Sequence, residues 1–80
     1  MERTEVFDRM NKVFRDVFDD DDISVTDVTT AKDIDDWDSL MHITLVSEVE
    51  DEFGIHFQMK DVTKMQNVGE MVDKIQELVS

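Results

Sequence analysis

Apolar side chains recur at steps of three and four residues along this chain, and no proline interrupts them. Between residues 6 and 18 this spacing predicts an amphipathic helix, because residues three and four apart lie on the same helix face. The apolar stripe consists of Val6, Phe7, Met10, Val13, Phe14, Val17 and Phe18. Thr4 is a candidate N-cap for this helix. The run Asp19 to Asp22 should end it, because negative charge is unfavourable at a helix C-terminus.

Two further helices and a short one are predicted in the second half of the chain. A helix over residues 38–53 precedes Gly54, which suits a left-handed C-cap. A short turn of helix is expected around residues 61–65. Asn67 opens the last helix, with Glu70 placed for a capping box, and its stripe consists of Val68, Met71, Val72, Ile75, Leu78 and Val79. Alternating strand patterns are absent, so the sequence predicts an all-α fold of three main helices and one short helix.

The segment between the first two helices, residues 23–38, is predicted to be a long loop. It is rich in Thr, Ser and Asp, whose side chains compete for backbone hydrogen bonds and favour turns. Five apolar residues are spaced through it as anchors that can hold it against the helices: Ile23, Val25, Val28, Ile34 and Trp37. With only two glycines, no repeat and no flexible linker, residues 1–80 are expected to form one domain.

The charge balance narrows the range of partners. Asp and Glu outnumber Lys and Arg by 21 to 8, which gives a formal net charge of −13. Such a field repels phosphate backbones and attracts proteins with basic patches, so we expect no nucleic-acid partner. With 40% apolar residues the chain is too hydrophobic for a disordered acidic tail. Without a long apolar run or an apolar leader, the sequence predicts a cytoplasmic protein with no membrane span.

The usual signatures of catalysis and metal binding are missing from the sequence. The absence of cysteine excludes disulfides and thiolate metal sites. No Ser/His/Asp spacing and no phosphate-cradling glycine loop is present. The aspartate run at residues 19–22 lacks the alternating ligands and the glycine of a calcium-binding loop. His56 has no evident acidic partner, so we assign it no role, and we predict neither a catalytic residue nor a metal site.

The helix over residues 38–53 carries apolar residues on two faces. At about 100° per residue, His42, Leu45, Val46, Val49 and Phe53 share a core stripe, whereas Leu40, Ile43, Thr44, Ser47 and Asp51 share the opposite face. Acidic residues flank Leu40 and Ile43, so this face is either a docking surface for a partner with an apolar cleft and a basic rim, or a set of scattered surface hydrophobes.

Ser39 stands at the start of the same helix. Free backbone N–H groups and the positive end of the helix dipole would accommodate a phosphate esterified to its hydroxyl. A serine at a helix start is more commonly only an N-cap. From the residues alone, both interpretations stay open.

The string Asp38-Ser39-Leu40, followed by a helix that ends in Val49-Glu50-Asp51-Glu52-Phe53-Gly54-Ile55, resembles the signature of acyl carrier proteins. The resemblance covers essentially the whole chain. It implies a four-helix bundle with a long loop between the first and second helices. It also implies that Ser39 receives 4'-phosphopantetheine from coenzyme A, through a phosphopantetheinyl transferase that supplies Mg²⁺. The thiol of that arm holds acyl groups as thioesters, so the chain would be a carrier and not an enzyme.

The resemblance also implies a surface for partner enzymes. Asp38 and Leu40 flank the modified serine, and the acidic part of the helix would bind Lys and Arg on acyl-loading and acyl-transferring enzymes. We therefore expect partner contacts at Asp38, Leu40, Met41, Ile43, Ser47, Glu48, Glu50, Asp51 and Glu52. His42, three residues after Ser39, either fills the core face or tunes the entrance of the arm. The protein is expected to be a monomer.

Two departures from the family pattern bear on the pathway. Met41 and Thr44 stand where many fatty-acid carriers have acids, and Trp37 replaces a small residue. Trp-Asp-Ser-Leu is more similar to carriers of specialised or polysaccharide-linked pathways, so the pathway is either one of these or fatty acid biosynthesis. The alternatives are an acidic helical interaction module with no prosthetic group, in which Ser39 is a cap, and an aminoacyl or peptidyl carrier.

Overall fold

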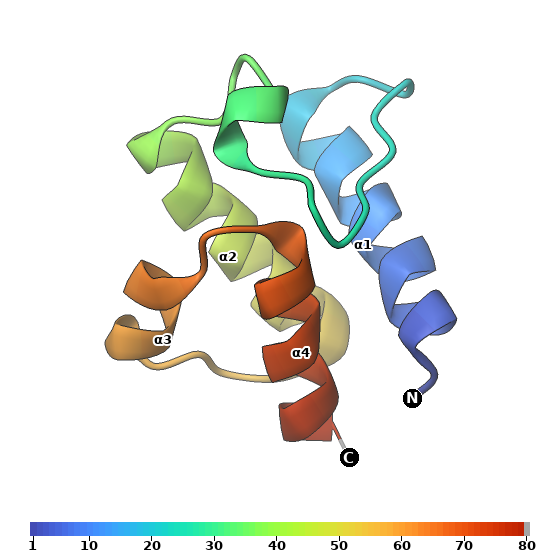
Figure 1. The fold of residues 1–80 in the computed structure, drawn as a ribbon, viewed down its shortest axis with the longest axis vertical. Coiled ribbons are helices and arrows are strands. Elements are labelled where there is room, and N and C mark those ends of the chain that lie inside the picture. Colours follow the sequence, from blue (N-terminus) through green and yellow to red (C-terminus); the bar gives the residue numbers. More distant parts are fainter. Residues whose placement is uncertain (80) are drawn as a thin grey trace.

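The computed structural model describes residues 1–79 and contains no strand among them. The helices are α1 (Arg3–Phe18), α2 (Ser39–Phe53), α3 (Met59–Lys64) and α4 (Val68–Val79), and a 3-10 helix, η1 (Ala31–Asp33), lies in the loop between α1 and α2 (Figure 1). The predicted all-α architecture of three main helices and one short one is confirmed. Ser80, the last residue of the predicted domain, lies outside the described residues. Within residues 1–79, no helix combines the length and apolarity needed to cross a bilayer.

Helix α1 begins earlier than its apolar stripe. Glu2 is the N-cap residue and makes no side-chain capping bond, while its carbonyl accepts from the N–H of Val6 at 3.0 Å. The prediction that Thr4 caps the helix is therefore wrong, since Thr4 lies inside the first turn. At the other end Asp19 adopts the left-handed conformation with φ 51° and its N–H donates to the carbonyl of Arg15. The aspartate run thus follows the helix, as predicted.

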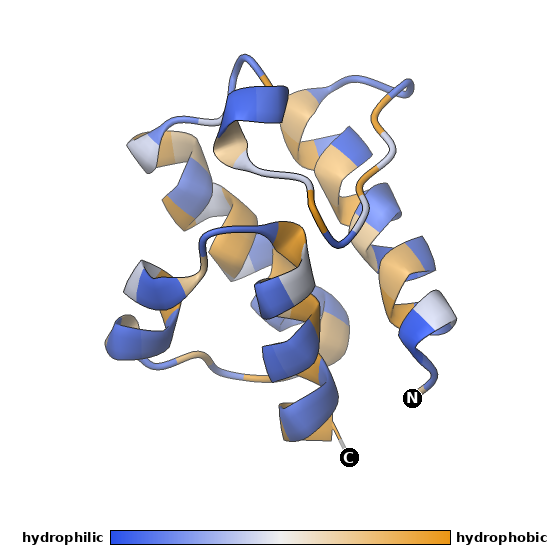
Figure 2. Ribbon diagram, in the orientation of Figure 1, coloured by the Kyte–Doolittle hydropathy of each residue, from blue (hydrophilic) through white to orange (hydrophobic). Residues whose placement is uncertain are grey.

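The core lies between α1, α2 and α4, and α1 packs against both of the others. Apolar residues of these helices turn toward one another while hydrophilic residues face outward (Figure 2). The largest fully buried side chains are Phe14, Met10, Leu45, Met71 and Ile75. Of the five loop anchors, Val25 and Trp37 are buried, and Ile23 and Ile34 pack partly buried against the core. The prediction that Val28 is the fifth anchor is wrong, because Val28 is 78% exposed.

Polar side chains of α1 hold the first part of the long loop. The side-chain oxygen of Asn11 accepts from the backbone N–H of Val25 at 2.6 Å. The Nε of Arg15 donates to the carbonyl of Ile23 at 2.7 Å. Each bond satisfies a backbone group that has no partner in regular secondary structure. The predicted loop is therefore ordered by α1 as well as by its apolar anchors.

The middle of the loop is held by the start of α4. The N–H of Val68 donates to the carbonyl of Thr29 at 2.9 Å, and the N–H of Gly69 donates to the carbonyl of Asp27 at 3.1 Å. These donors are two of the N–H groups that a helix start leaves unpaired. A hydrogen bond from Arg3 to Asp27 ties the start of α1 to the same point. This bond and a second one to Asp73 raise the pKa of Arg3 above its ordinary value.

The ends of α2, α3 and α4 agree with the sequence in most respects. Gly54 is the left-handed C-cap of α2 with φ 65°, as predicted. Helix α3 covers Met59–Lys64 and so begins two residues earlier than expected. Asn67 accepts from the N–H of Glu70 at 2.8 Å, which confirms it as the cap of α4. The second bond of the predicted capping box would run from the N–H of Asn67 to the side chain of Glu70. Instead, Glu70 accepts from the N–H of Gln66 at 2.8 Å.

Candidate functional site

Asp38 caps α2. Its Oδ1 accepts from the N–H of Met41 at 2.8 Å, and its carbonyl accepts from the N–H of His42 at 2.8 Å. Ser39 is the first residue with helical geometry. The interpretation of Ser39 as the helix cap is therefore wrong, since the carboxylate before it already performs that role.

The Ser39 side chain is exposed, and its hydroxyl makes no hydrogen bond with residues 1–79. Over the same residues, the backbone N–H groups of Ser39 and Leu40 have no acceptor, as expected for the first positions of a helix. The first turn of α2, all of which is described, carries no acidic side chain. A free hydroxyl, free N–H groups and the positive end of the helix dipole thus lie together, in an arrangement that favours an attached anion.

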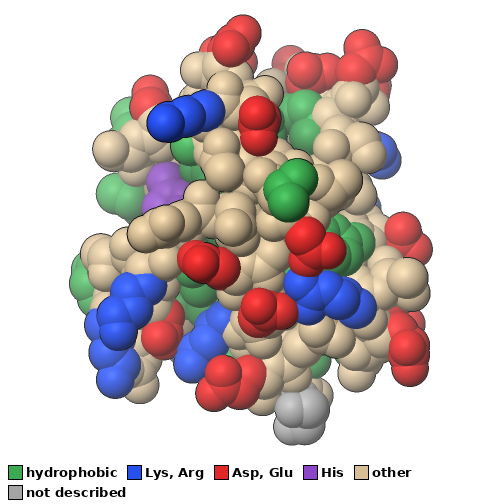
Figure 3. All heavy atoms as spheres, in the orientation of Figure 1, with side chains coloured by type: hydrophobic (Ala, Val, Ile, Leu, Met, Phe, Trp, Pro, Cys, Tyr) green, Lys and Arg blue, Asp and Glu red, His purple; other side chains and the backbone are tan. Residues whose placement is uncertain are grey.

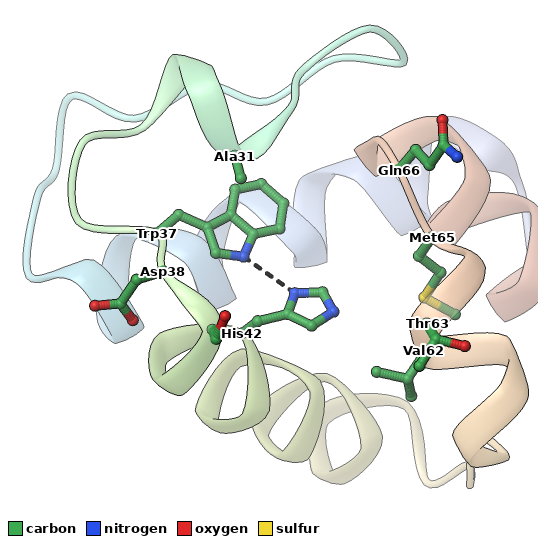
Figure 4. Close-up of a pocket in the computed structure, with 9 residues that line it drawn as sticks. Ala31, Trp37, Asp38, His42, Val62, Thr63, Met65 and Gln66 are labelled. Atoms are coloured by element: carbon green, nitrogen blue, oxygen red, sulfur yellow. Dashed lines mark hydrogen bonds between the residues drawn. The ribbon is translucent and has the colours of Figure 1, made fainter.

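A cavity of about 490 Å³ opens beside Ser39. Figure 4 shows α2 and the end of the long loop on one side of it, and α3 with the segment after it on the other. Its lining consists of Ala31, Trp37, Asp38, Ser39, His42, Val62, Thr63, Met65 and Gln66. The wall is mixed in character, because apolar Trp37, Val62 and Met65 alternate with groups that can form hydrogen bonds.

Trp37 and His42 form a fixed pair in this wall. The indole Nε1 of Trp37 donates to Nδ1 of His42 at 3.0 Å, and the two rings stack with centroids 5.8 Å apart (Figure 4). The indole also packs edge-on against Phe14 of α1 at 5.3 Å. His42 is partly buried, as one interpretation of the sequence predicted, and it also lines the cavity next to Ser39.

The outer face of α2 carries the apolar pair that the helical wheel placed there. Leu40 is 72% exposed and Ile43 is 66% exposed. Ser47, Glu48 and Asp51 are exposed as well. Acidic side chains are widespread on the face of the molecule shown in Figure 3. Met41 differs from these residues, because it is partly buried and packs against the core.

Two of the four acids expected on the docking surface have partners within the fold. Glu50 accepts from the N–H of Phe57 at 2.7 Å and lies 3.2 Å from Nδ1 of His56. Glu52 forms an ion pair of 3.9 Å with Arg9 of α1. Their side chains are only 21% and 28% exposed. The expectation that His56 lacks an acidic partner is wrong, and Glu50 holds the segment between α2 and α3.

Replacing Glu50 by alanine should lower the free energy of unfolding by about 1–3 kcal/mol, because the N–H of Phe57 would lose its acceptor. Glu48→Ala is the matched control, since Glu48 lies on the same helix but its side chain makes no hydrogen bond or ion pair within residues 1–79. Its effect should stay within about 0.5 kcal/mol. Urea unfolding of the two variants measures the difference, and equal stabilities would show that Glu50 has no structural role.

The sequence did not identify the α3 side of the cavity. Val62, Thr63, Met65 and Gln66 come from a short helix and the segment after it, which are too short to give a clear periodicity. Only the folded chain brings them opposite His42. Among residues 1–79, no group of His, Asp and Glu side chains could hold a metal ion.

The Ser39 hydroxyl is exposed and has no activating partner within residues 1–79. No base bonds to it in residues 1–79, whereas a catalytic serine needs an adjacent base within hydrogen-bond reach. The arrangement therefore suits a residue on which another enzyme acts.

Comparison with known proteins identifies a family and a similar solved structure. The family described as "Phosphopantetheine attachment site" matches residues 12–75. Among solved structures, the chain is similar to the solution NMR structure of a holo acyl carrier protein from Geobacter metallireducens. The two share 39% sequence identity and superimpose with a TM-score of 0.87, over 92% of this chain and 85% of the other.

Proposed function

This chain belongs to the acyl carrier proteins, and we propose that Ser39 is the residue that bears its phosphopantetheine arm. Members of the family are carriers, not catalysts, and the arm is covalently attached. The thiol of the arm holds an acyl group as a thioester. Tethering in this way raises the effective concentration of the cargo at the active site of each partner enzyme.

The exposed hydroxyl of Ser39, which makes no hydrogen bond with residues 1–79, is the observation that carries this proposal. The residues around it fit a phosphate ester, because the N–H groups of Ser39 and Leu40 are free among residues 1–79 and the first turn, described throughout, carries no acid. Asp38 holds the helix start in place through its bond to Met41. The transferase can therefore reach Ser39 without unfolding α2.

We also propose that partner enzymes bind the outer face of α2. The surface begins at Asp38 and Leu40 and continues along the exposed residues Ile43, Ser47, Glu48 and Asp51. Exposed apolar side chains flanked by acids are complementary to an apolar cleft with a basic rim. Met41, Glu50 and Glu52 are omitted from this surface, because their contacts lie within the fold.

The pathway is proposed from the sequence around Ser39. Met41 and Thr44 make the start of α2 less acidic than in many fatty-acid carriers, and Trp37 precedes the Asp-Ser-Leu motif. These features favour a specialised or polysaccharide-linked pathway over fatty acid biosynthesis, and an aminoacyl or peptidyl cargo is the second candidate. A cytoplasmic monomer with one domain, expected from the sequence, stays a prediction.

The proposal is tested by incubating the protein with coenzyme A, Mg²⁺ and a broad-specificity phosphopantetheinyl transferase. The intact mass should rise by one phosphopantetheine group, and fragment ions should place that group on Ser39. A plain interaction module would show no rise in mass. Modification of Ser24 or Ser47 in place of Ser39 would also overturn the proposal.

A further inference from the structure

We propose that His42 binds a carbonyl oxygen of the arm or its cargo through its Nε2–H, and that Trp37 fixes the ring in the tautomer that makes this bond. The inference rests on the proposed attachment of the arm to Ser39. It makes His42 a binding residue of the carrier and Trp37 a positioning residue that acts through it.

The tautomer follows from the hydrogen bond between the two rings. An indole N–H can only donate, so Nδ1 of His42, 3.0 Å from Nε1 of Trp37, must accept. A neutral imidazole has one N–H, and with Nδ1 unprotonated the hydrogen is on Nε2. A half-turn of the ring would put a carbon in the place of Nδ1 and so break this bond.

Trp37 is itself held firmly. It is 9% exposed, and its indole contacts two aromatic rings of α1, Phe14 at 5.3 Å and Phe18 at 6.3 Å. The orientation of the His42 ring is therefore set by the core and not by a mobile surface group. A donor held in one direction loses little conformational freedom when it binds an acceptor.

The second nitrogen of His42 faces the cavity. Figure 4 shows it directed away from Trp37 and toward the α3 side, where Val62 and Thr63 lie. No group in residues 1–79 accepts a hydrogen bond from it. Among the same residues, no buried side-chain nitrogen or oxygen lacks a partner, so the unpaired Nε2 is open to the cavity. The cavity beside Ser39 thus contains a fixed donor that has no acceptor in the described part of the chain.

The chemistry that matches this donor is a carbonyl oxygen. A neutral N–H forms no hydrogen bond with a hydrocarbon chain. Contact with one removes water from the N–H, which costs free energy. The phosphopantetheine arm contains amide carbonyls, and the acyl cargo adds a thioester carbonyl. Both present a carbonyl oxygen as the acceptor. Ser39 and His42 line the same cavity of about 490 Å³, so an arm attached to Ser39 starts in the cavity that contains the His42 donor.

The test uses the full-length ¹⁵N-labelled protein in three forms: apo, holo with a free thiol, and loaded with a butyryl group from butyryl coenzyme A. Long-range ¹H–¹⁵N spectra of the imidazole read the tautomer. The apo form should show an unprotonated Nδ1 and a rapidly exchanging Hε2. Exchange of Hε2 should slow by about 5- to 10-fold when a carbonyl binds it, the factor expected for one ordinary hydrogen bond.

The three forms identify the acceptor. Slowing in the holo form assigns it to an amide carbonyl of the arm, and slowing only in the butyryl form assigns it to the thioester. Thr44→Ala, an exposed change on the same helix, should retain the slowing. Trp37→Phe, which removes the indole donor, should raise the share of the Nδ1–H tautomer and lose the slowing.

Two results would overturn the inference. One is a protonated Nδ1 in the apo wild-type protein. This measurement does not depend on whether any variant folds. The other is unchanged Hε2 exchange in protein whose mass shows that the arm is attached, which refutes the role of His42 and leaves the carrier function standing. If no arm can be attached, the proposed function fails and the inference fails with it.

Discussion

Replacing Ser39 by alanine is expected to abolish the mass increase in the transferase reaction completely, because no other hydroxyl stands at the start of α2. The fold should be retained. Asp38, not Ser39, caps the helix, and the Ser39 side chain makes no hydrogen bond with residues 1–79. The free energy of unfolding should therefore change by no more than about 0.5 kcal/mol. Intact mass and urea unfolding measure the two effects separately.

Ser24→Ala is the matched control, since Ser24 is an exposed serine outside the proposed partner surface. It should load like the wild-type protein. A mass increase that survives Ser39→Ala would place the arm elsewhere. A large loss of stability in Ser39→Ala would show instead that the variant fails to load because it is unfolded.

Asp38→Ala, unlike Ser39→Ala, should lower the free energy of unfolding. The N–H of Met41 would lose its acceptor, and the expected cost of a lost cap is about 1 kcal/mol. The comparison of Asp38→Ala with Ser39→Ala by thermal unfolding therefore separates the cap from the attachment residue. Equal and small effects of both changes would contradict the assignment of Asp38 as the cap.

Replacing Gly69 by alanine is expected to have a large effect on stability. At an open helix position this change stabilises by about 0.5–1 kcal/mol. Here an added Cβ would lie 2.6 Å from the carbonyl oxygen of Asp27. Gly69 also donates its N–H to that same oxygen, so the loop cannot move away without losing the bond. We expect a loss of about 1–3 kcal/mol, which lowers the Tm by several degrees or more.

Gly54→Asn is the contrasting variant. Gly54 needs its left-handed φ of 65°, but an added Cβ would meet nothing within 4 Å. Asparagine tolerates this conformation, so Gly54→Asn should cost less than about 1 kcal/mol. Thermal unfolding of both variants is the measurement. A Gly69→Ala protein as stable as the wild type would show that the loop does not approach α4 as closely as described.

The helices could be predicted because their determinants are local. Apolar stripes at three- and four-residue spacing, Gly54 after α2 and Asn67 before α4 act over one or two turns of chain. The helix start at Ser39 was predictable for the same reason. The start of α1 was not, since it depends on the backbone bond between Glu2 and Val6 and not on a polar cap.

The candidate site could be predicted only in part, because the rest depends on tertiary contacts. All four acids at the end of α2 look alike in the sequence. The fold gives Glu50 the N–H of Phe57 and Glu52 the guanidinium of Arg9, and both partners lie outside α2. The pairing of Trp37 with His42 likewise requires the indole to be held against α1. These pairings depend on tertiary packing, so the spacing of residues in the sequence does not predict them.

The most direct test of the central claim is the mass of the protein purified from its native host, with fragment ions that locate any added group. We expect phosphopantetheine, free or acylated, on the peptide that contains Ser39, and the mass of the acyl group would identify the cargo. An unmodified Ser39 in a chain that carries the arm on another residue would contradict this expectation.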